Sequence, residues 1–231
     1  MTRPKILIVL SSASNGWYLP EFAHPYEVLS PTCDLTIASP LGGPTVLDPI
    51  SVQLFKDDSY CQEFAQTKQK LWLETRKLDE FTGKAGEFDA ILYVGGFGPM
   101  FDLVDNKVST DLIIEFHEKH KIVSAVCHGA AALLKATLPD GTLFIKEEKV
   151  TGFSNAEEIA VDRQKDMPFH LETALDVASG GGYEKADQAW GEKVVVSVSG
   201  DGEGRKRLLT GQNPASAKGM AVELLKMLAE G

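Results

Sequence analysis

The chain has 231 residues, of which 33 are acidic and 23 are lysine or arginine, giving a formal net charge of −10 at neutral pH. Hydrophobic residues make up 43% of it, enough for a substantial core, and the length suits one large α/β domain or two small ones. The acidic balance argues against sequence-independent nucleic-acid binding, which needs a basic surface to neutralise phosphates.

The three cysteines, Cys33, Cys61 and Cys127, are widely spaced and form no CxxC pair. They predict neither a disulfide framework nor a zinc site, so we expect no metal and favour a reducing, cytoplasmic location. The apolar run that begins at Lys5 reaches polar residues after about six positions, too few for a signal sequence or a membrane span. No later stretch is long and apolar enough, and no membrane association is expected.

Apolar, β-rich runs alternate with helical patterns along the chain, and no linker, repeat or low-complexity segment interrupts them. In chain order we expect strand 5–10, helix 19–29, strand 33–40, helix 59–81, strand 88–96, helix 109–121, strand 122–126, a helix from about 128, strand 149–153, a helix near 155–162, strands 193–199 and 207–211 as a hairpin around "GDGEG", and a helix within 213–230. Ser59 and Gln62 resemble a capping box at the start of the fourth element.

This alternation predicts an α/β fold with a mainly parallel sheet and helices on both of its faces. We expect one domain over residues 1–231, with 159–192 as an elaboration beside the sheet. In open α/β sheets, binding sites form beyond the carboxyl ends of the strands. Three features lie at such ends: the Gly95-Gly96 pair, the Cys127-His128 pair and the residues after Gly152.

The sequence "AVCHG" (125–129) places small residues two positions before and two positions after Cys127. That spacing is typical of a nucleophile elbow, a strand-to-helix turn so tight that bulky neighbours would clash. The turn exposes the sulfur at the start of a helix, where the helix dipole and free N–H groups favour the thiolate. The alternative is a packed core cysteine, the common fate of an isolated thiol.

Next to this elbow, Gly95 and Gly96 follow a strand, and their N–H groups, with that of His128, can form an oxyanion hole. The glycines match neither a dinucleotide fingerprint nor a P-loop, so no cofactor is expected. Residues i and i+1 of an elbow point in different directions, so the His128 ring need not touch the sulfur. The remaining histidines show no metal-ligand spacing; they are His24, His117, His120 and His170.

Two acidic positions are candidates for handling protons. Glu21 follows Pro20 at the presumed start of the first helix, from which a carboxyl group can reach the thiol. A helix-terminal acid that only interacts with the dipole is the alternative. Glu157 and Glu158 follow "VTGFSNA", and one of them can orient His128 as the third member of a triad. Taken alone, either position is more typical of a solvated helix residue.

Five separated pieces together resemble the PfpI and class I glutamine amidotransferase-like superfamily, most of all its glutathione-independent glyoxalase branch of compact fungal type. They are "PEFAHPYEVL", "YVGGFGPMFDL", "AVCHGAAALL", "VTGFSNAEE" and "LLTGQNPASA". The resemblance covers residues 5–229 and implies a flavodoxin-like fold and a homodimer. It implies Cys127 as nucleophile, His128 with Glu158 as its acid partner, and Glu21 as the proton-handling glutamate.

The activity that the resemblance implies is conversion of methylglyoxal and water to D-lactate without glutathione, with a small 2-oxoaldehyde as substrate. No histidine follows His170, which argues against glutamine hydrolysis, because true amidotransferases place a histidine late in the chain. Two alternatives stay open. One is a cysteine amidase or peptidase on the same elbow, and the other is a holdase-type chaperone or redox-stress protein whose Cys127 is oxidised.

Overall fold

The computed structural model describes residues 3–200, 202 and 205–230, and within them seven strands form one sheet in the order β3-β2-β1-β4-β5-β7-β6. The strands are β1 (Lys5–Val9), β2 (Asp34–Ser39), β3 (Arg76–Lys77), β4 (Ala90–Tyr93), β5 (Ile122–Val126), β6 (Val194–Ser199) and β7 (Lys206–Gly211). Every neighbouring pair is parallel except β6 and β7, which run antiparallel. This confirms the predicted α/β fold with a mainly parallel sheet.

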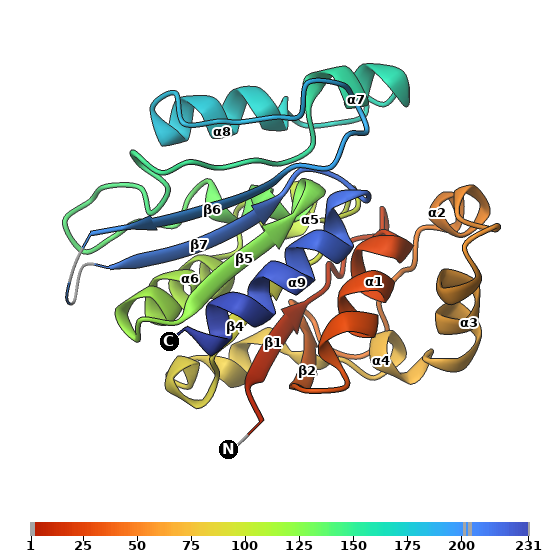
Figure 1. Cartoon of the computed structure of the whole chain (residues 1–231), viewed down its shortest axis with the longest axis horizontal. Helices are drawn as coiled ribbons and strands as arrows, with labels where there is room; N and C mark the ends of the chain where they lie inside the picture. The colour runs from red at the N-terminus through yellow and green to blue at the C-terminus, as the bar shows by residue number, and fades with distance from the viewer. Residues whose placement is uncertain (1–2, 201, 203–204, 231) are drawn as a thin grey trace.

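Helices cover both faces of the sheet: α1 and α9 pack together on one face, and α6 lies behind β4 and β5 on the other (Figure 1). The α-helices are α1 (Leu19–Leu29), α2 (Pro49–Leu54), α3 (Ser59–Thr67), α4 (Lys70–Leu73), α5 (Pro99–Asp102), α6 (Lys107–Glu118), α7 (Asn155–Ala160), α8 (Leu171–Ser179) and α9 (Ser216–Ala229), and the 3₁₀ segments are η1 (Leu78–Phe81), η2 (Ala85–Glu87) and η3 (Cys127–Leu133). None of the described helices is both long and apolar enough to cross a bilayer.

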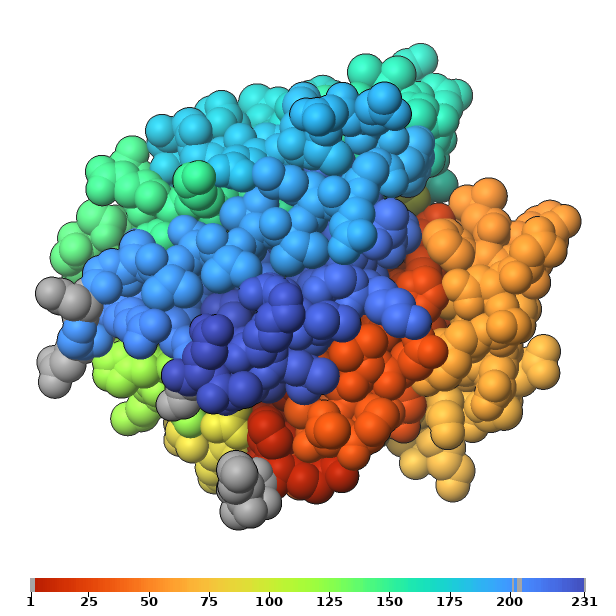
Figure 2. Space-filling model, in the orientation of Figure 1, coloured from red at the N-terminus to blue at the C-terminus, as the bar shows by residue number. Residues whose placement is uncertain are grey.

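The central strands are buried on both faces, as their unbroken apolar sequences predict. Four of the five residues of β1 and all those of β4 and β5 are buried. The C-terminal helix α9 closes one face by packing against α1, so the two ends of the chain lie side by side (Figure 2). Segments near both ends of the sequence therefore cover this face of the sheet together.

The prediction of one helix over 59–81 is wrong. The chain instead forms α3, α4, the short edge strand β3 and η1, because residues 76–77 pair with the end of β2 and leave the helical path. Trp72, Leu78 and Phe81 are apolar because each is buried in the core, and their spacing resembles that of a helix although the segment is not one. The helix cap also differs, since Asp58, not Ser59, accepts a hydrogen bond from the helix, from the Cys61 N–H at 2.9 Å.

The predicted strand at 149–153 is also wrong. Val150 forms only an isolated bridge with Tyr183, and the Thr151 N–H donates to the side chain of Thr210 at 2.9 Å and not to a strand backbone. The helix expected from His128 is a 3₁₀ segment, η3. The antiparallel β6–β7 pair is present, whereas the predicted turn "GDGEG" lies mostly outside the described residues. Residues 159–192 contribute α8, which lies beside α7 beyond the sheet (Figure 1).

Candidate active site

The chain makes an abrupt turn where β5 ends. Cys127 follows Val126 with φ +56°, in the left-handed region that non-glycine residues seldom adopt and that concentrates at functional sites. Two residues later, a Cβ on Gly129 would lie 2.5 Å from the carbonyl oxygen of Tyr93, so only glycine fits. This is the tight strand-to-helix turn that the small residues of "AVCHG" predict.

The thiol of Cys127 is 3% exposed and lies 3.3 Å from Nδ1 of His128. The other ring nitrogen, Nε2, pairs with a carboxylate oxygen of the buried Glu158. The imidazole lies between two aromatic rings, with centroid distances of 5.0 Å to Phe97 and 4.5 Å to Phe153. The Cys127 sulfur, the His128 imidazole and the Glu158 carboxylate are thus in continuous contact. The geometry of the elbow alone did not predict that the His128 ring would reach the sulfur.

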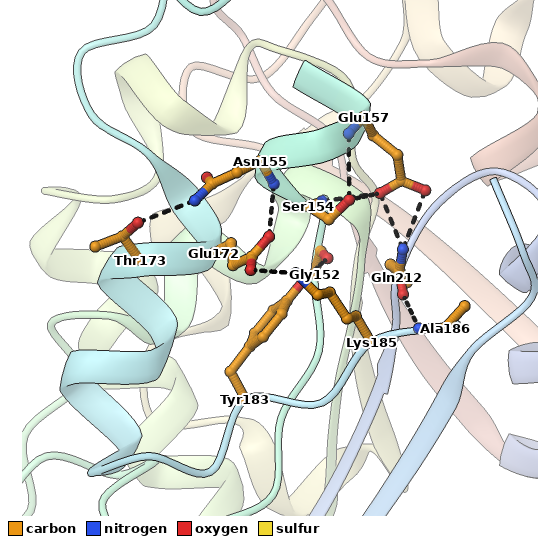
Figure 3. Close-up of polar contacts among 10 residues, drawn as sticks. All are labelled: Gly152, Ser154, Asn155, Glu157, Glu172, Thr173, Tyr183, Lys185, Ala186 and Gln212. Carbon is orange, nitrogen blue, oxygen red and sulfur yellow. Dashed lines mark hydrogen bonds and ion pairs between the residues drawn. The ribbon is translucent and has the colours of Figure 1, made fainter. Parts of the chain in front are cut away.

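Glu157, the neighbour of Glu158, has a different environment. Its carboxylate accepts hydrogen bonds from Ser154 N and Oγ, in a capping box that starts α7, and from Gln212 Nε2 (Figure 3). It also accepts from Asn213 Nδ2 at 2.7 Å and from the N–H of Trp190 at 2.9 Å. Glu157 therefore links α7 to the segment after β7 through hydrogen bonds, whereas Glu158 contacts His128.

A second pair of contacts fixes the segments around α7. Glu172 accepts from the N–H of Asn155 at 2.7 Å and from Lys185 Nζ at 2.7 Å (Figure 3). The Tyr183 hydroxyl donates to the carbonyl of Gly152 at 2.8 Å (Figure 3). These bonds link the loop before α7, helix α8 and the loop after it, so the elaboration beside the sheet supports the element that carries Glu158.

The Glu21 carboxyl group lies beside the thiol. It is completely buried in the first turn of α1, and among the described residues its oxygens have no well-aligned hydrogen bond, the Cys127 thiol and the Gly96 N–H being the polar groups beside them. A Cβ on Gly95 would lie 2.4 Å from Glu21 Oε2 and 2.7 Å from Cys127 Cβ. Gly95 thus leaves the space in which carboxyl and thiol approach each other, and Gly96 lines the cavity in front of them.

Burial raises the pKa of Glu21 well above its ordinary range, although contact with the Cys127 thiol and the Gly96 N–H lowers it in part, and the charges of Glu157 and Asp48 raise it further. Burial also raises the pKa of Cys127, and the nearby Glu21 charge adds to the increase. The N–H of His128 lowers the thiol pKa, but by less than burial raises it. The turn thus lowers the thiol pKa through the His128 N–H, as expected, but burial outweighs this effect, and carboxyl and thiol both hold their protons more tightly than usual.

The thiol opens into a cavity of about 290 Å³. Sequence reasoning missed most of its lining, because the residues come from several loops and from the short helix α2, which meet only after folding. They are Tyr18, Asp48, Ile50, Leu54, Phe97, Phe153, Val161, Arg163, Trp190 and Pro214. The Arg163 guanidinium lies 4.7 Å from the centre of the Phe97 ring, which places one cation at an otherwise largely apolar wall.

The cavity thus combines a thiol, an imidazole–carboxylate pair and a buried, unpaired carboxyl group in an aromatic surround. Such a site can form a covalent adduct and move a proton on the adduct without a metal ligand. The one cluster of potential metal ligands among the described residues is His24, Asp58 and Cys61, and none of the three lines this cavity.

The chain belongs to the DJ-1/PfpI family, whose sequence profile matches residues 5–227. Its fold is close to that of the rapid encystment protein 24 kDa of Francisella tularensis, at a TM-score of 0.83 and 31% identity, covering 97% of this chain and 99% of that one. The flavodoxin-like fold that the sequence motifs imply is thereby confirmed.

Two groups of curated relatives carry different names. Glyoxalase 3 of Candida albicans is 26% identical over 96% of this chain and 97% of its own length. A crystal structure of glyoxalase III from Candida albicans superimposes with a TM-score of 0.77 at 24% identity, over 96% of each chain. Bovine glutamine amidotransferase-like class 1 domain-containing protein 1 is 27% identical over 93% of this chain and 90% of its own. The glyoxalase relatives support the predicted place in the glyoxalase III branch of the superfamily.

Proposed function

We propose that this protein is a glutathione-independent glyoxalase that converts methylglyoxal, or a similarly small 2-oxoaldehyde, and water to D-lactate or the corresponding 2-hydroxy acid. The observation that carries the proposal is the buried Glu21 carboxyl, which lies beside the Cys127 thiol and has no other side chain as a hydrogen-bond partner among the described residues. Relatives named glyoxalase support the same reaction class. The D configuration follows from the family resemblance.

The reactive form of the site holds one proton shared between Glu21 and Cys127. The thiolate sulfur adds to the aldehyde carbon C1, and the new alkoxide takes the proton of the Glu21 carboxyl, giving a neutral hemithioacetal and a carboxylate. This carboxylate removes the C1 proton, which gives an enediolate with its negative charge on the C2 oxygen. The proton of the C1 hydroxyl passes to the C2 oxygen, and Glu21 delivers to C2 the proton that it took from C1, which leaves a lactoyl thioester on Cys127 and Glu21 as a carboxylate.

Water completes the cycle. It adds to the thioester carbonyl and gives up a proton that passes to the Glu21 carboxylate, the C–S bond breaks, and the 2-hydroxy acid leaves with the Cys127 thiolate and the protonated Glu21 restored. We assign His128 to the proton transfer from this water, with Glu158 holding the ring in orientation, because the two pair directly and both are buried. The N–H groups of Gly95, Gly96 and His128 are proposed to stabilise the oxyanions.

The size and lining of the cavity favour a small substrate. A volume of about 290 Å³ lies at the low end of ligand sites, and aromatic rings surround the imidazole. Burial also raises the pKa of Glu21, which keeps the carboxyl protonated for the first step. A three-carbon 2-oxoaldehyde fits such an enclosed site, whereas an extended peptide does not.

The test is lactate formation from methylglyoxal by purified protein without added thiol, with D- and L-lactate distinguished by stereospecific dehydrogenases. We expect Cys127→Ala and Glu21→Gln each to lose about a thousandfold or more of the turnover. Cys33→Ser is the matched control, because Cys33 is also buried but lies away from the cavity. Lactate formation at the wild-type rate by Cys127→Ala would refute the proposal.

A second candidate is a cysteine hydrolase acting on small amides or esters, favoured by the continuous contact from Cys127 through His128 to Glu158. In that case Glu158→Gln abolishes hydrolysis of a small amide, whereas Glu21→Gln leaves it largely intact. An oxidation sensor is less well supported, because such thiols are accessible and have a low pKa, whereas Cys127 is buried with a raised pKa. The homodimer and the cytoplasmic location stay predictions.

A further inference from the structure

Three potential metal ligands converge where α1 meets the start of α3. His24 Nε2 lies 2.8 Å from Asp58 Oδ2 and 3.6 Å from Cys61 Sγ, and all three ligand atoms lie within 4.8 Å of one another. Cys61 is fully buried, whereas the side chains of His24 and Asp58 are 17% and 28% exposed. The cluster therefore has a buried base and an open side through which an ion can enter.

The spacing of the cluster fits a tetrahedral zinc ion. Bond lengths of about 2.3 Å to sulfur and about 2.0–2.1 Å to nitrogen and oxygen imply separations near ~3.6 Å between sulfur and nitrogen and ~3.3 Å between nitrogen and oxygen. The observed distance from Cys61 Sγ to His24 Nε2 is 3.6 Å and already matches. The pair of His24 and Asp58, at 2.8 Å, needs to open by about half an ångström as the ion replaces their hydrogen bond.

The charges around the cluster favour a cation. The Asp58 carboxylate supplies one negative charge, and its Oδ2 lies 2.8 Å from His24 Nε2. A divalent ion bound there displaces the proton of the Cys61 thiol and is neutralised by one thiolate and one carboxylate. The imidazole and sulfur donors select zinc-like ions over magnesium and calcium.

We propose that His24, Asp58 and Cys61 form a zinc site with three protein ligands and one water, which fastens α1 to α3. The site is structural, because none of the three residues lines the catalytic cavity. It bears on the chemistry indirectly: His24 lies one helical turn after Glu21 on α1, so an ion there holds the helix that carries the buried carboxyl. Sequence spacing gives no sign of it, since His24 and Asp58 are 34 positions apart.

The proposal is tested on the full chain, stripped of metal and titrated with Zn²⁺ against a chromophoric chelator. We expect one ion per chain, with Cys61→Ser and His24→Gln each weakening binding by about tenfold or more. Asp58→Asn is the matched variant, because asparagine can still cap α3 while the anionic ligand is lost. Co²⁺ should give a thiolate charge-transfer band that Cys61→Ser removes and Cys127→Ser retains.

Zinc should also raise the Tm of the wild-type chain and of Cys127→Ser, because a ligand bound only to the folded state stabilises it, and should leave the Tm of Cys61→Ser unchanged. Far-ultraviolet circular dichroism shows whether each variant is folded before titration. The proposal is overturned if the folded wild-type chain binds no zinc. It is equally overturned if binding survives in Cys61→Ser and disappears in Cys127→Ser, which would place the ion on the catalytic thiol.

Discussion

Replacing Glu21 by glutamine should stabilise the protein, and the gain should grow with pH. Glu21 is completely buried with no hydrogen-bond partner among the described residues, and burial raises its pKa well above the ordinary value. The unfolded chain ionises this carboxyl near pH 4.3, whereas the folded chain keeps the proton until its higher pKa is reached. Rising pH therefore favours the unfolded state in the wild type and not in Glu21→Gln.

The sign and size follow from proton linkage. Below about pH 4 both states of the wild type are protonated, and the two proteins should differ little, since glutamine and a protonated glutamate are similar in shape and neutral. From about pH 4.3 up to the folded pKa, each pH unit costs the wild type ~1.4 kcal/mol. For a chain of this length that is roughly 3–6 °C in Tm for each unit of raised pKa.

The measurement is the Tm of wild type and Glu21→Gln from pH 4 to pH 8 at a fixed scan rate, followed by circular dichroism. The quantity that matters is the pH dependence of the difference, because a constant offset reports only packing. Glu157→Gln is a useful contrast, since the Glu157 carboxylate accepts several hydrogen bonds and glutamine should weaken the fold. A flat difference between wild type and Glu21→Gln, or one that shrinks with rising pH, would refute the assigned burial penalty.

Three further predictions concern the site. Gly95→Ala should lower kcat/KM by at least about tenfold and the free energy of unfolding by ~1–3 kcal/mol, because its Cβ would lie 2.4 Å from a Glu21 oxygen; kinetics and denaturant melts check both. Glu158→Gln should lower kcat by about a hundredfold and leave the fold intact, whereas Glu157→Gln should lower the free energy of unfolding by ~3 kcal/mol. A stable but inactive Glu157→Gln, or an active but unstable Glu158→Gln, would contradict the roles assigned. The pH profile of kcat/KM should rise through an apparent pKa above an ordinary carboxyl's, because the buried carboxyl–thiol pair must lose one proton.

Hydrophobic periodicity predicted the sheet well where both faces of a strand are buried. The runs that became β1, β4 and β5 are continuous and apolar, and burial on both sides permits no other pattern. The same reasoning failed at 59–81, where apolar residues recur at helical spacing although residues 76–77 pair with β2. Pairing at a sheet edge depends on tertiary contacts with a distant strand, so the spacing of apolar residues within the segment does not predict it.

For the site, sequence spacing pointed to Cys127 because small neighbours are a steric requirement of the turn itself. The position of the His128 ring could not be predicted, since it depends on Glu158 and on aromatic rings from distant loops. The net direction of the thiol pKa could not be predicted either. Local features such as an exposed N–H lower its pKa, but burial raises it more, and burial is a property of the folded chain as a whole.

The backbone of Cys127, at φ +56°, also bears on how this protein can evolve or be engineered. A side chain in the left-handed region costs the folded state on the order of 1 kcal/mol or more, and glycine avoids most of that cost. A screen of variants for heat resistance alone should therefore enrich Cys127→Gly, which should have a higher Tm than the wild type and no glyoxalase activity. Under the proposed function, the cysteine at this turn is required for the chemistry although glycine would suit the backbone better.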